Sequence, residues 1–250
     1  MLNKYLLPIV LFLLLLGSVP VYASSPVVES VRSGVGGNTN TLTVTSVTVP
    51  TSSNRMIIVS IGVEDGANGS TNCPVGSTTV DFASGTALTY LDAVTTTGTP
   101  TVACGATFIA IAPPQTTGSV VVTLPANVVD LMVGVLVLSN AAQNVTPSYV
   151  ENFINTDTLD AISTSFGSVV TDDLLVDMVV SGNAVTSISP LTPCTGTGTQ
   201  NNRLSVVGTG SNSAALAMGT RPQGAAGSAS MCHTQTDANR WAHLIARIAG

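Results

Sequence analysis

The two histidines of the chain, His233 and His243, are the side chains best suited to acid–base or metal chemistry near neutral pH. His233 follows Cys232 and lies near Ser230 and Asp237, whereas His243 alternates with apolar residues in the last segment. A Ser-His-Asp triad is defined by its geometry, and the chain has no G-x-S-x-G motif for a nucleophile. We therefore expect no catalytic triad, and we expect His243 to be packed in a strand or at its edge.

Carboxylates are the second candidate group. Asp173 and Asp177 would share one face of a strand, because side chains alternate between faces. A glycosidase needs two carboxyl groups about 5 to 9.5 Å apart across a groove, and sugar clefts usually add aromatic platforms, which are scarce at 4% aromatic content. The pairs Glu64-Asp65 and Asp172-Asp173 could bind calcium through their oxygens. Without an EF-hand spacing, we interpret them as solvated carboxylates in turns.

Aromatic residues offer few binding surfaces. The single tryptophan, Trp241, is expected in the core, and Tyr90 could be either a core or a ligand-binding residue. The sequence therefore predicts no catalytic residue, no cofactor and no metal ligand, and hence a protein that is not an enzyme.

The four cysteines, Cys73, Cys104, Cys194 and Cys232, form no C-x-x-C pair, which argues against a zinc or redox site. An even number of cysteines in an exported chain favours disulfides. We predict the pairs Cys73–Cys104 and Cys194–Cys232, because each pair then lies within one half of the chain and joins a loop to a nearby strand. The competing pairing, Cys73 with Cys232 and Cys104 with Cys194, would connect the two halves.

The first 23 residues are typical of a secretory signal peptide. Lys4 precedes an apolar stretch, Leu6 to Leu16, and Val21-Tyr22-Ala23 resembles a cleavage site. The stretch is shorter than the roughly 18 residues that a membrane span needs. We expect cleavage after Ala23, a secreted or cell-surface location, and no transmembrane segment in the mature chain.

Charge excludes some partners. Lys4 is the only lysine, and the whole chain carries 7 basic against 13 acidic residues. Such a chain repels phosphate backbones, so nucleic acid is not expected as a partner. Lysine-based covalent chemistry is excluded as well.

The remainder, residues 24–250, is expected to form a single β-sandwich domain. β-Branched residues dominate, and short apolar segments such as Thr41–Val49 and Arg55–Val63 are separated by Gly, Pro, Asn and Ser. Pro113-Pro114 should end one strand at a corner, because proline cannot donate to a sheet ladder. The polar stretch Asn140–Asp160 would cross between the halves. The fold class is thus all-β, an antiparallel two-sheet, jelly-roll-like sandwich.

Several motifs occur in a characteristic order: "NRMIIVSIGV", "LTYLDAV", an apolar strand closed by Pro-Pro, "VGVLVLSNAAQNVTP", "DDLLVDMVV", and a last strand opening with Trp-Ala. In this order the chain, from Asn40 to its end, resembles an uncharacterised secreted β-sandwich module of bacterial and archaeal cell-surface proteins. It departs from that module at Asp172, where members often carry Gly, and at Phe108, where members often carry Trp or Tyr. The resemblance implies a fold and a location, and no activity.

We therefore expect a non-enzymatic, exported β-sandwich that serves as a building block of a cell surface, matrix or filament. Its partners would be further copies of itself or other surface components in adhesion or assembly. The arm Ser25–Asn40 should pair with its own sheet or, alternatively, with a neighbouring molecule. A carbohydrate-binding module that binds polysaccharide, with or without calcium, is the alternative, and a hydrolase is the least favoured. Asn68 and Asn144 lie in glycosylation motifs.

Overall fold

The computed structural model describes residues 24–65, 77–96, 102–143, 147–154, 161–182, 187–209, 214–236 and 240–250. All regular elements in these ranges are β-strands, and none of the residues described belongs to a helix of the length and apolarity needed to cross a membrane. The predicted signal segment, Cys73, Asp237 and the two possible glycosylation sites lie outside the described residues.

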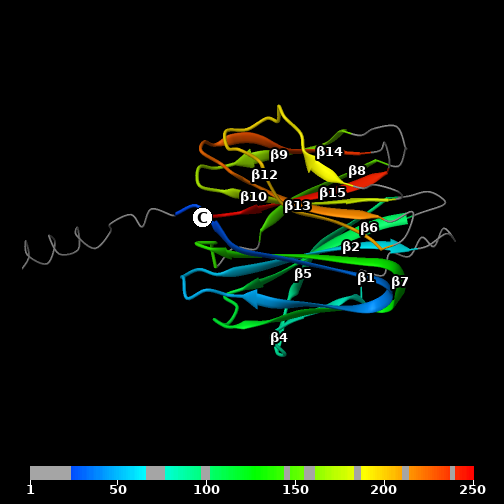
Figure 1. Cartoon of the computed structure of the whole chain (residues 1–250). Helices are drawn as coiled ribbons and strands as arrows, with labels where there is room; N and C mark the ends of the chain where they lie inside the picture. Colours follow the sequence, from blue (N-terminus) through cyan, green and yellow to red (C-terminus); the bar gives the residue numbers. More distant parts are fainter. Residues whose placement is uncertain are drawn as a thin grey trace, which may run out of the picture.

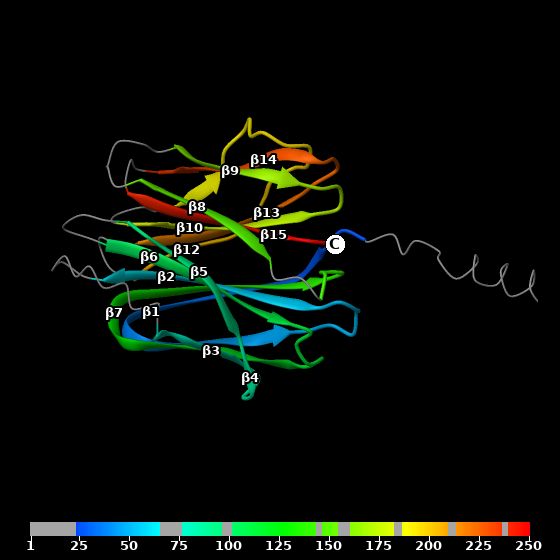
Figure 2. The ribbon, with the colours of Figure 1, turned by 180° about the vertical axis from the view of Figure 1, so that it is seen from behind.

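The strands form three antiparallel sheets, which stack above one another in Figures 1 and 2. The strands are β1 (Val27–Thr48), β2 (Met56–Asp65), β3 (Thr79–Phe82), β4 (Thr86–Ala87), β5 (Thr89–Thr95), β6 (Val102–Ile111), β7 (Thr117–Ser139), β8 (Ser148–Ile154), β9 (Ala161–Val169), β10 (Leu174–Ser181), β11 (Ile188–Pro190), β12 (Asn201–Val207), β13 (Ala215–Pro222), β14 (Gly227–Gln235) and β15 (Trp241–Ile248).

The first sheet, which we call the wrapped sheet, has the order β4-β3-β7-β2-β6-β5, with β1 also paired to β7. The long strands β1 and β7 bend together, because their register shifts between the pairs Thr39–Val128 and Thr41–Thr123. On one side of the bend β7 pairs with β2, and on the other it pairs with β3. The wrapped sheet thereby folds over onto itself and makes the N-terminal sandwich.

The core of the N-terminal sandwich lies between the two parts of the wrapped sheet. Ile57 and Val59 of β2 are buried in one cluster with Val120 and Val122, which belong to the other part. Strict alternation explains this packing, since every second residue of β2 points into this core while Met56 and Ile58 point to the opposite face.

The second half of the chain makes the C-terminal sandwich from two further sheets. The middle sheet has the order β12-β13-β10-β15-β8, and the outer sheet has the order β11-β14-β9. Side chains of both sheets meet in two clusters, one of which joins Phe166 of β9 and Met231 of β14 to Leu175 of β10. The outer sheet therefore covers one face of the middle sheet.

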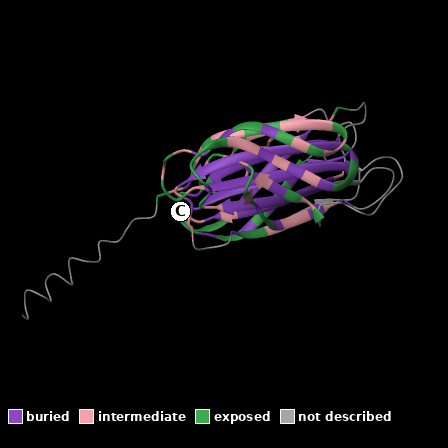
Figure 3. Cartoon of the chain, turned by 90° about the horizontal axis from the view of Figure 1, so that it is seen from below, coloured by how far each residue is buried: buried purple, intermediate pink, exposed green. Residues whose placement is uncertain are grey.

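The two sandwiches are packed face to face through the middle sheet. Leu174 and Val176 of β10 lie in one cluster with Met56 and Ile58 of β2. Strand β10 is consequently buried along its whole length, with even-numbered residues facing the N-terminal sandwich and odd-numbered ones facing the outer sheet. Figure 3 shows these buried strands enclosed by strands that carry the exposed positions.

The sequence-based fold class, an all-β antiparallel sandwich, is confirmed. The structure has three sheets where the sequence predicts two, because each half of the chain builds its own sandwich. The corner at Pro113-Pro114 is also confirmed, since β6 ends at Ile111 and β7 begins at Thr117. The sequence predicts separate strands over Ser119–Leu124 and Asp130–Leu138, yet these residues belong to one bent strand that changes partners near Pro125.

The N-terminal arm pairs with its own molecule. Residues Val27–Thr39 of β1 lie antiparallel to Ser139–Val128 of β7. Of the two pairings that the sequence leaves open for the arm, self-pairing is the one that this structure contains.

Candidate functional site

Three polar side chains meet at the centre of the C-terminal sandwich. Asp177 comes from β10 and His243 from its neighbour β15 in the middle sheet, whereas His233 comes from β14 in the outer sheet. All three are buried at core-facing positions; on β10, for example, Asp177 lies between Leu175 and Val179. We call these residues the Asp-His-His cluster.

Both imidazoles point at the same carboxylate oxygen. The Nε2 atom of His233 lies 2.5 Å from Asp177 Oδ2, and the Nε2 atom of His243 lies 2.9 Å from it. The two rings meet edge to face, with their centroids 5.6 Å apart. The side chains of His233, His243 and Asp177 are all 0% exposed, so the cluster is sealed from solvent.

The second carboxylate oxygen of Asp177 is held by the backbone. Gly219 on the neighbouring strand β13 donates its N–H to Asp177 Oδ1 at 2.6 Å. A Cβ atom at position 219 would lie 2.7 Å from that oxygen, so only glycine permits this approach. Asp177 is therefore fixed on both of its oxygens.

The charges of the cluster follow from its burial. Burial alone would raise the pKa of Asp177, but attraction to His233 and hydrogen bonding with both histidines outweigh it and hold that pKa well below its usual range. Burial lowers the pKa of His243, against the opposing effect of Asp177. The carboxylate is accordingly ionised, and the cluster is a buried charge that its neighbours must compensate.

The side chain of Gln200 is bonded to strand β14 of the outer sheet next to His233. Its side-chain Oε1 accepts a hydrogen bond from the Cys232 N–H at 2.9 Å, and its Nε2 donates to the Cys232 carbonyl at 2.8 Å. The same Nε2 atom lies 3.2 Å from His233 Nε2. The Nδ1 atoms of His233 and His243, in contrast, are buried and have no hydrogen-bond partner among the described residues.

The Asp-His-His cluster can link the two sheets or hold a cation, but its side chains are not accessible to a substrate in solution. Two imidazole nitrogens and one carboxylate oxygen lie within 4.8 Å of one another. Because the group has no exposed surface, catalysis on an external molecule would need the sandwich to open.

A second group of buried acids lies between the sandwiches. Glu64 of β2 and Asp130 of β7 are paired in register, and both accept hydrogen bonds from the connection between β12 and β13. The Ala214 N–H donates to Glu64 Oε2 at 2.8 Å, and the N–H and Oγ1 of Thr209 donate to Asp130 Oδ1 at 2.8 and 3.0 Å. Burial, with a smaller contribution from Asp130, raises the pKa of Glu64 to about 7.

The interpretation of the acidic pairs as solvated turn carboxylates is wrong for two of their members. Glu64 is 5% exposed and accepts a hydrogen bond from the Ala214 N–H, and Asp173 is 1% exposed. Asp173 Oδ2 accepts hydrogen bonds from the Arg247 guanidinium at 2.5 Å and from the Val170 N–H at 2.6 Å. Asp172 is partly buried and accepts a hydrogen bond from Ser25.

Three further residues that the sequence singles out, Ser230, Trp241 and Tyr90, are not members of the Asp-His-His cluster. Ser230 is buried, and its hydroxyl shares a hydrogen bond with the hydroxyl of Ser165. Trp241 is in the core, as predicted, at 3% exposure, whereas Tyr90 is 47% exposed and packs edge to face on Phe108.

Cys194 and Cys232 form a disulfide, in the pairing expected from the sequence. Cys104 is buried in the core and is disulfide-bonded. Its expected partner Cys73 lies outside the described residues, so the pair Cys73–Cys104 stays a prediction.

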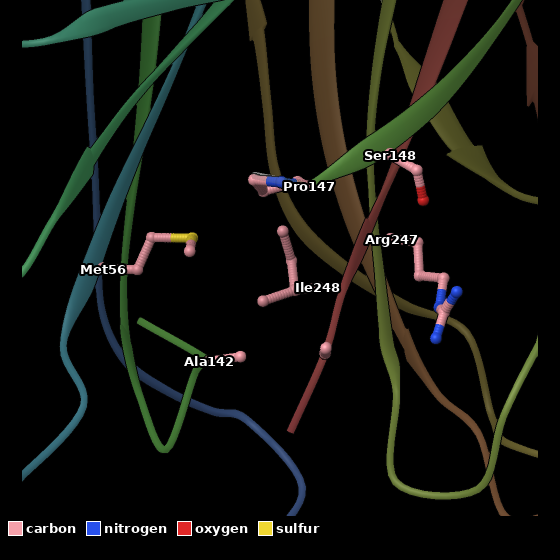
Figure 4. Close-up of a pocket in the computed structure, with 7 residues that line it drawn as sticks. Met56, Ala142, Pro147, Ser148, Arg247 and Ile248 are labelled. Atoms are coloured by element: carbon pink, nitrogen blue, oxygen red, sulfur yellow. The ribbon is translucent and has the colours of Figure 1, made fainter. Parts of the chain in front are cut away.

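Two small surface pockets are lined by described residues. One pocket, of about 50 Å³, lies where the chain crosses between the halves and is lined by Met56, Pro147 and Ile248, among others. Figure 4 shows Ile248 pointing toward Met56, while the Arg247 guanidinium points the other way. A second, more open pocket of about 280 Å³ lies beside Tyr90. Typical ligand sites have about 300 to 1,000 Å³.

Comparison with protein-family models and with curated proteins gives no match to this sequence. The chain is described by its own geometry: an all-β, stacked-sandwich protein with a sealed Asp-His-His cluster and a disulfide in its C-terminal half.

Proposed function

We propose that the protein is an exported, non-enzymatic β-sandwich that acts as a building block of a cell surface, matrix or filament. The observation that carries this proposal is strand β9, the edge of the outer sheet. Strand β9 spans nine residues, alternates between exposed and buried positions, and contains no charged residue and no proline.

Edge strands of soluble proteins are usually protected by charges, prolines or bulges, because an unprotected edge can pair with another chain. Strand β9 has one irregularity, between Phe166 and Val169, and its segment Ala161–Phe166 pairs with β14 in regular register. Among the described strands, β9 pairs only with β14. A second copy of the chain could therefore add a strand beside β9 through main-chain hydrogen bonds.

The chemistry of the chain agrees with a durable extracellular part. The Cys194–Cys232 disulfide is suited to an oxidising compartment, and the N-terminal segment has the pattern of a signal peptide. The residues most capable of catalysis, His233, His243 and Asp177, are sealed in the core. The resemblance to secreted surface modules supports the exported location.

Assembly is tested with the mature chain beginning at Ser24, by multi-angle light scattering and negative-stain electron microscopy over a range of concentrations. We expect oligomers or filaments, and we expect Ser165→Lys on the exposed face of β9 to reduce them strongly. Thr123→Lys, on the central strand β7, is the matched control and should leave assembly unchanged. A mature chain that stays monomeric at every concentration would contradict the proposal.

A carbohydrate-binding role is the second candidate because of the pocket at Tyr90. The pocket is lined by Tyr90, whose side chain is exposed, together with Thr86, Thr89 and Ile109, and an exposed aromatic ring is a common platform for a sugar. A glycan array with wild type and Tyr90→Ala tests it: binding that disappears in the variant would favour this role, and an array without signal would remove it.

A further inference from the structure

The Asp-His-His cluster has the composition and convergence of a metal site. Its donor atoms come from three strands and from both sheets of the C-terminal sandwich, and they lie within 4.8 Å of one another. Strands β10, β14 and β15 each direct a polar atom to one point, with the apolar side chains of Leu175, Val179 and Ile245 close by on the same face.

The Nε2 atom of His233 cannot satisfy both of its polar neighbours by hydrogen bonding. Its Nε2 atom lies 2.5 Å from Asp177 Oδ2, which is an acceptor, and 3.2 Å from Gln200 Nε2, which is a donor oriented by the Cys232 backbone. A protonated Nε2 opposes the Gln200 donor, and a bare Nε2 opposes the carboxylate. A cation between Nε2 and Oδ2 removes the conflict with the carboxylate, because both atoms then direct lone pairs at the ion.

The other ring nitrogens leave the cluster incompletely satisfied as well. The Nδ1 atoms of His233 and His243 are buried and have no partner within the described part of the chain. An ion bound at the two Nε2 atoms does not reach the Nδ1 atoms, which point to the other side of each ring, so these atoms need a further partner such as an ordered water molecule.

We propose that Asp177, His233 and His243 bind a divalent transition-metal ion of the zinc class, as a structural link between the middle and outer sheets. Two imidazole nitrogens and one carboxylate oxygen are a donor set that suits such ions better than Ca²⁺ or Mg²⁺, which prefer oxygen ligands. This inference departs from the sequence-based expectation that the chain has no metal ligand.

The distances fit an ion after a small expansion. Donors about 2.1 Å from a tetrahedral Zn²⁺ lie roughly 3.4 Å from one another. The Oδ2–Nε2 distances here are 2.5 and 2.9 Å, so the donors must separate by less than about 1 Å. Rotation of the two imidazole rings on their strands can supply that movement, while Gly219 keeps Asp177 in place.

Enclosure determines how the ion enters. The three side chains are 0% exposed, so the ion would bind while the outer sheet closes over the middle sheet during folding. Metal binding would then contribute directly to the stability of the folded state. A water molecule would complete the coordination, since the described residues provide three donors.

The test uses the untagged mature chain, unfolded in denaturant with a chelator and refolded with ZnCl₂, CoCl₂, CaCl₂ or chelator alone. After gel filtration, we expect about one zinc or cobalt ion per chain by mass spectrometry of the metals, and no retained calcium. The cobalt form should show visible ligand-field absorption, and the zinc form should unfold at a higher temperature than the metal-free form.

The variants His243→Gln and Asp177→Asn should lose the bound ion and the zinc-dependent shift in unfolding temperature. Ser181→Ala is the matched control, because Ser181 lies on the same face of β10 and is 0% exposed, but its hydroxyl binds Gln235 and Arg240. It should lower stability without changing the metal content. Wild type that retains no metal, or metal that persists in both cluster variants, would overturn the proposal.

Discussion

Asp177 is a residue whose neighbours are all adapted to it. Two histidines contact one of its oxygens and the Gly219 N–H contacts the other, so both carboxylate oxygens have partners that favour the charge. Removing one partner from such a buried group costs more than the bond is worth, because the remaining partners are left without compensation. The cluster should therefore respond to small steric changes as well as to loss of its members.

Gly219→Ala should lower the free energy of unfolding by about 1 to 3 kcal/mol, because the new Cβ would lie 2.7 Å from Asp177 Oδ1 and would displace it. The matched control is Gly167→Ala on β9, where a Cβ would meet no atom within 4 Å. That change should be within about 0.5 kcal/mol of wild type. Urea denaturation of both variants measures the difference. Equal losses of unfolding free energy would show that the contact with Asp177 does not explain the effect at position 219.

At the scale of elements, the connection between β12 and β13 is attached to the N-terminal sandwich through Glu64 and Asp130. Its Thr209 and Ala214 donate hydrogen bonds to these two acids. The acids themselves lie side by side on β2 and β7. The proton content of Glu64 should therefore affect how firmly this connection is held.

The contribution of Glu64 to the free energy of unfolding should fall as pH rises from 4.5 to about 7. The pKa of Glu64 is raised from 4.5 to about 7 in the folded protein, so the folded state binds more protons than the unfolded state between these values, and unfolding becomes easier as pH increases. Glu64→Gln cannot titrate and should lack this component. Urea midpoints of wild type and variant at about pH 5 and pH 8 measure it; parallel pH profiles would contradict the prediction.

The loop between β11 and β12 is held to the outer sheet by a disulfide and to the middle sheet by an arginine of β13. Cys194 is bonded to Cys232, and the Arg221 guanidinium donates to four carbonyls, those of Cys194, Thr195, Gly198 and Ser230. Both attachments act on the segment that carries Gln200, the side chain that fixes Cys232 beside His233.

Replacing both cysteines, Cys194→Ser with Cys232→Ser, should lower the free energy of unfolding by about 4 kcal/mol. The bond closes a loop with a sequence separation of 38 residues, and the magnitude follows from the freedom that it removes from the unfolded chain. Guanidinium denaturation measures the loss. Non-reducing peptide mapping of wild type is the control, and a fragment that joins Cys104 to Cys194 would show that the pairing itself is wrong.

Strand positions could be predicted from the sequence because apolar and polar residues alternate locally, and Trp241 could be placed in the core for the same reason. The bend of β7 could not be predicted from the sequence, because β7 bends together with β1, a strand that is far away in the sequence. The burial of Glu64 depends on Ala214, 150 residues away. The sequence identifies His233 and Asp177 singly, yet their meeting depends on how the outer sheet lies on the middle sheet. A polar residue at a core-facing position of an apolar strand is the signal that could have found them.

At the scale of the whole molecule, the two sandwiches interlock through glycines and methionines. Gly105 and Gly134 of the wrapped sheet face Met178 and Met218 of the middle sheet, and a Cβ at either glycine would lie 2.5 Å from a methionine sulfur. Flexible methionine side chains fill the space that the glycines leave. The two halves of the chain therefore share one packed interface, which should make them unfold as one unit.

Gly134→Val should disrupt that interface, because its side chain would collide with Met218 Sδ and with Leu204 Cδ2, which lies 2.9 Å from the added Cβ. Overpacking of this kind costs about 1 to 3 kcal/mol. Trp241 fluorescence reports on the C-terminal sandwich, and circular dichroism reports on all strands. In wild type the two unfolding curves should coincide, and in Gly134→Val the fluorescence and dichroism midpoints should separate.

A second substitution at the same contact separates the effect of the interface from a general loss of stability. Met218→Ala, added to Gly134→Val, makes room for the valine and should bring the two unfolding curves back together. In a double-mutant cycle the two substitutions should then be coupled, with the pair less destabilising than the sum of the singles. Strict additivity would mean that the sandwiches do not meet at these residues in solution.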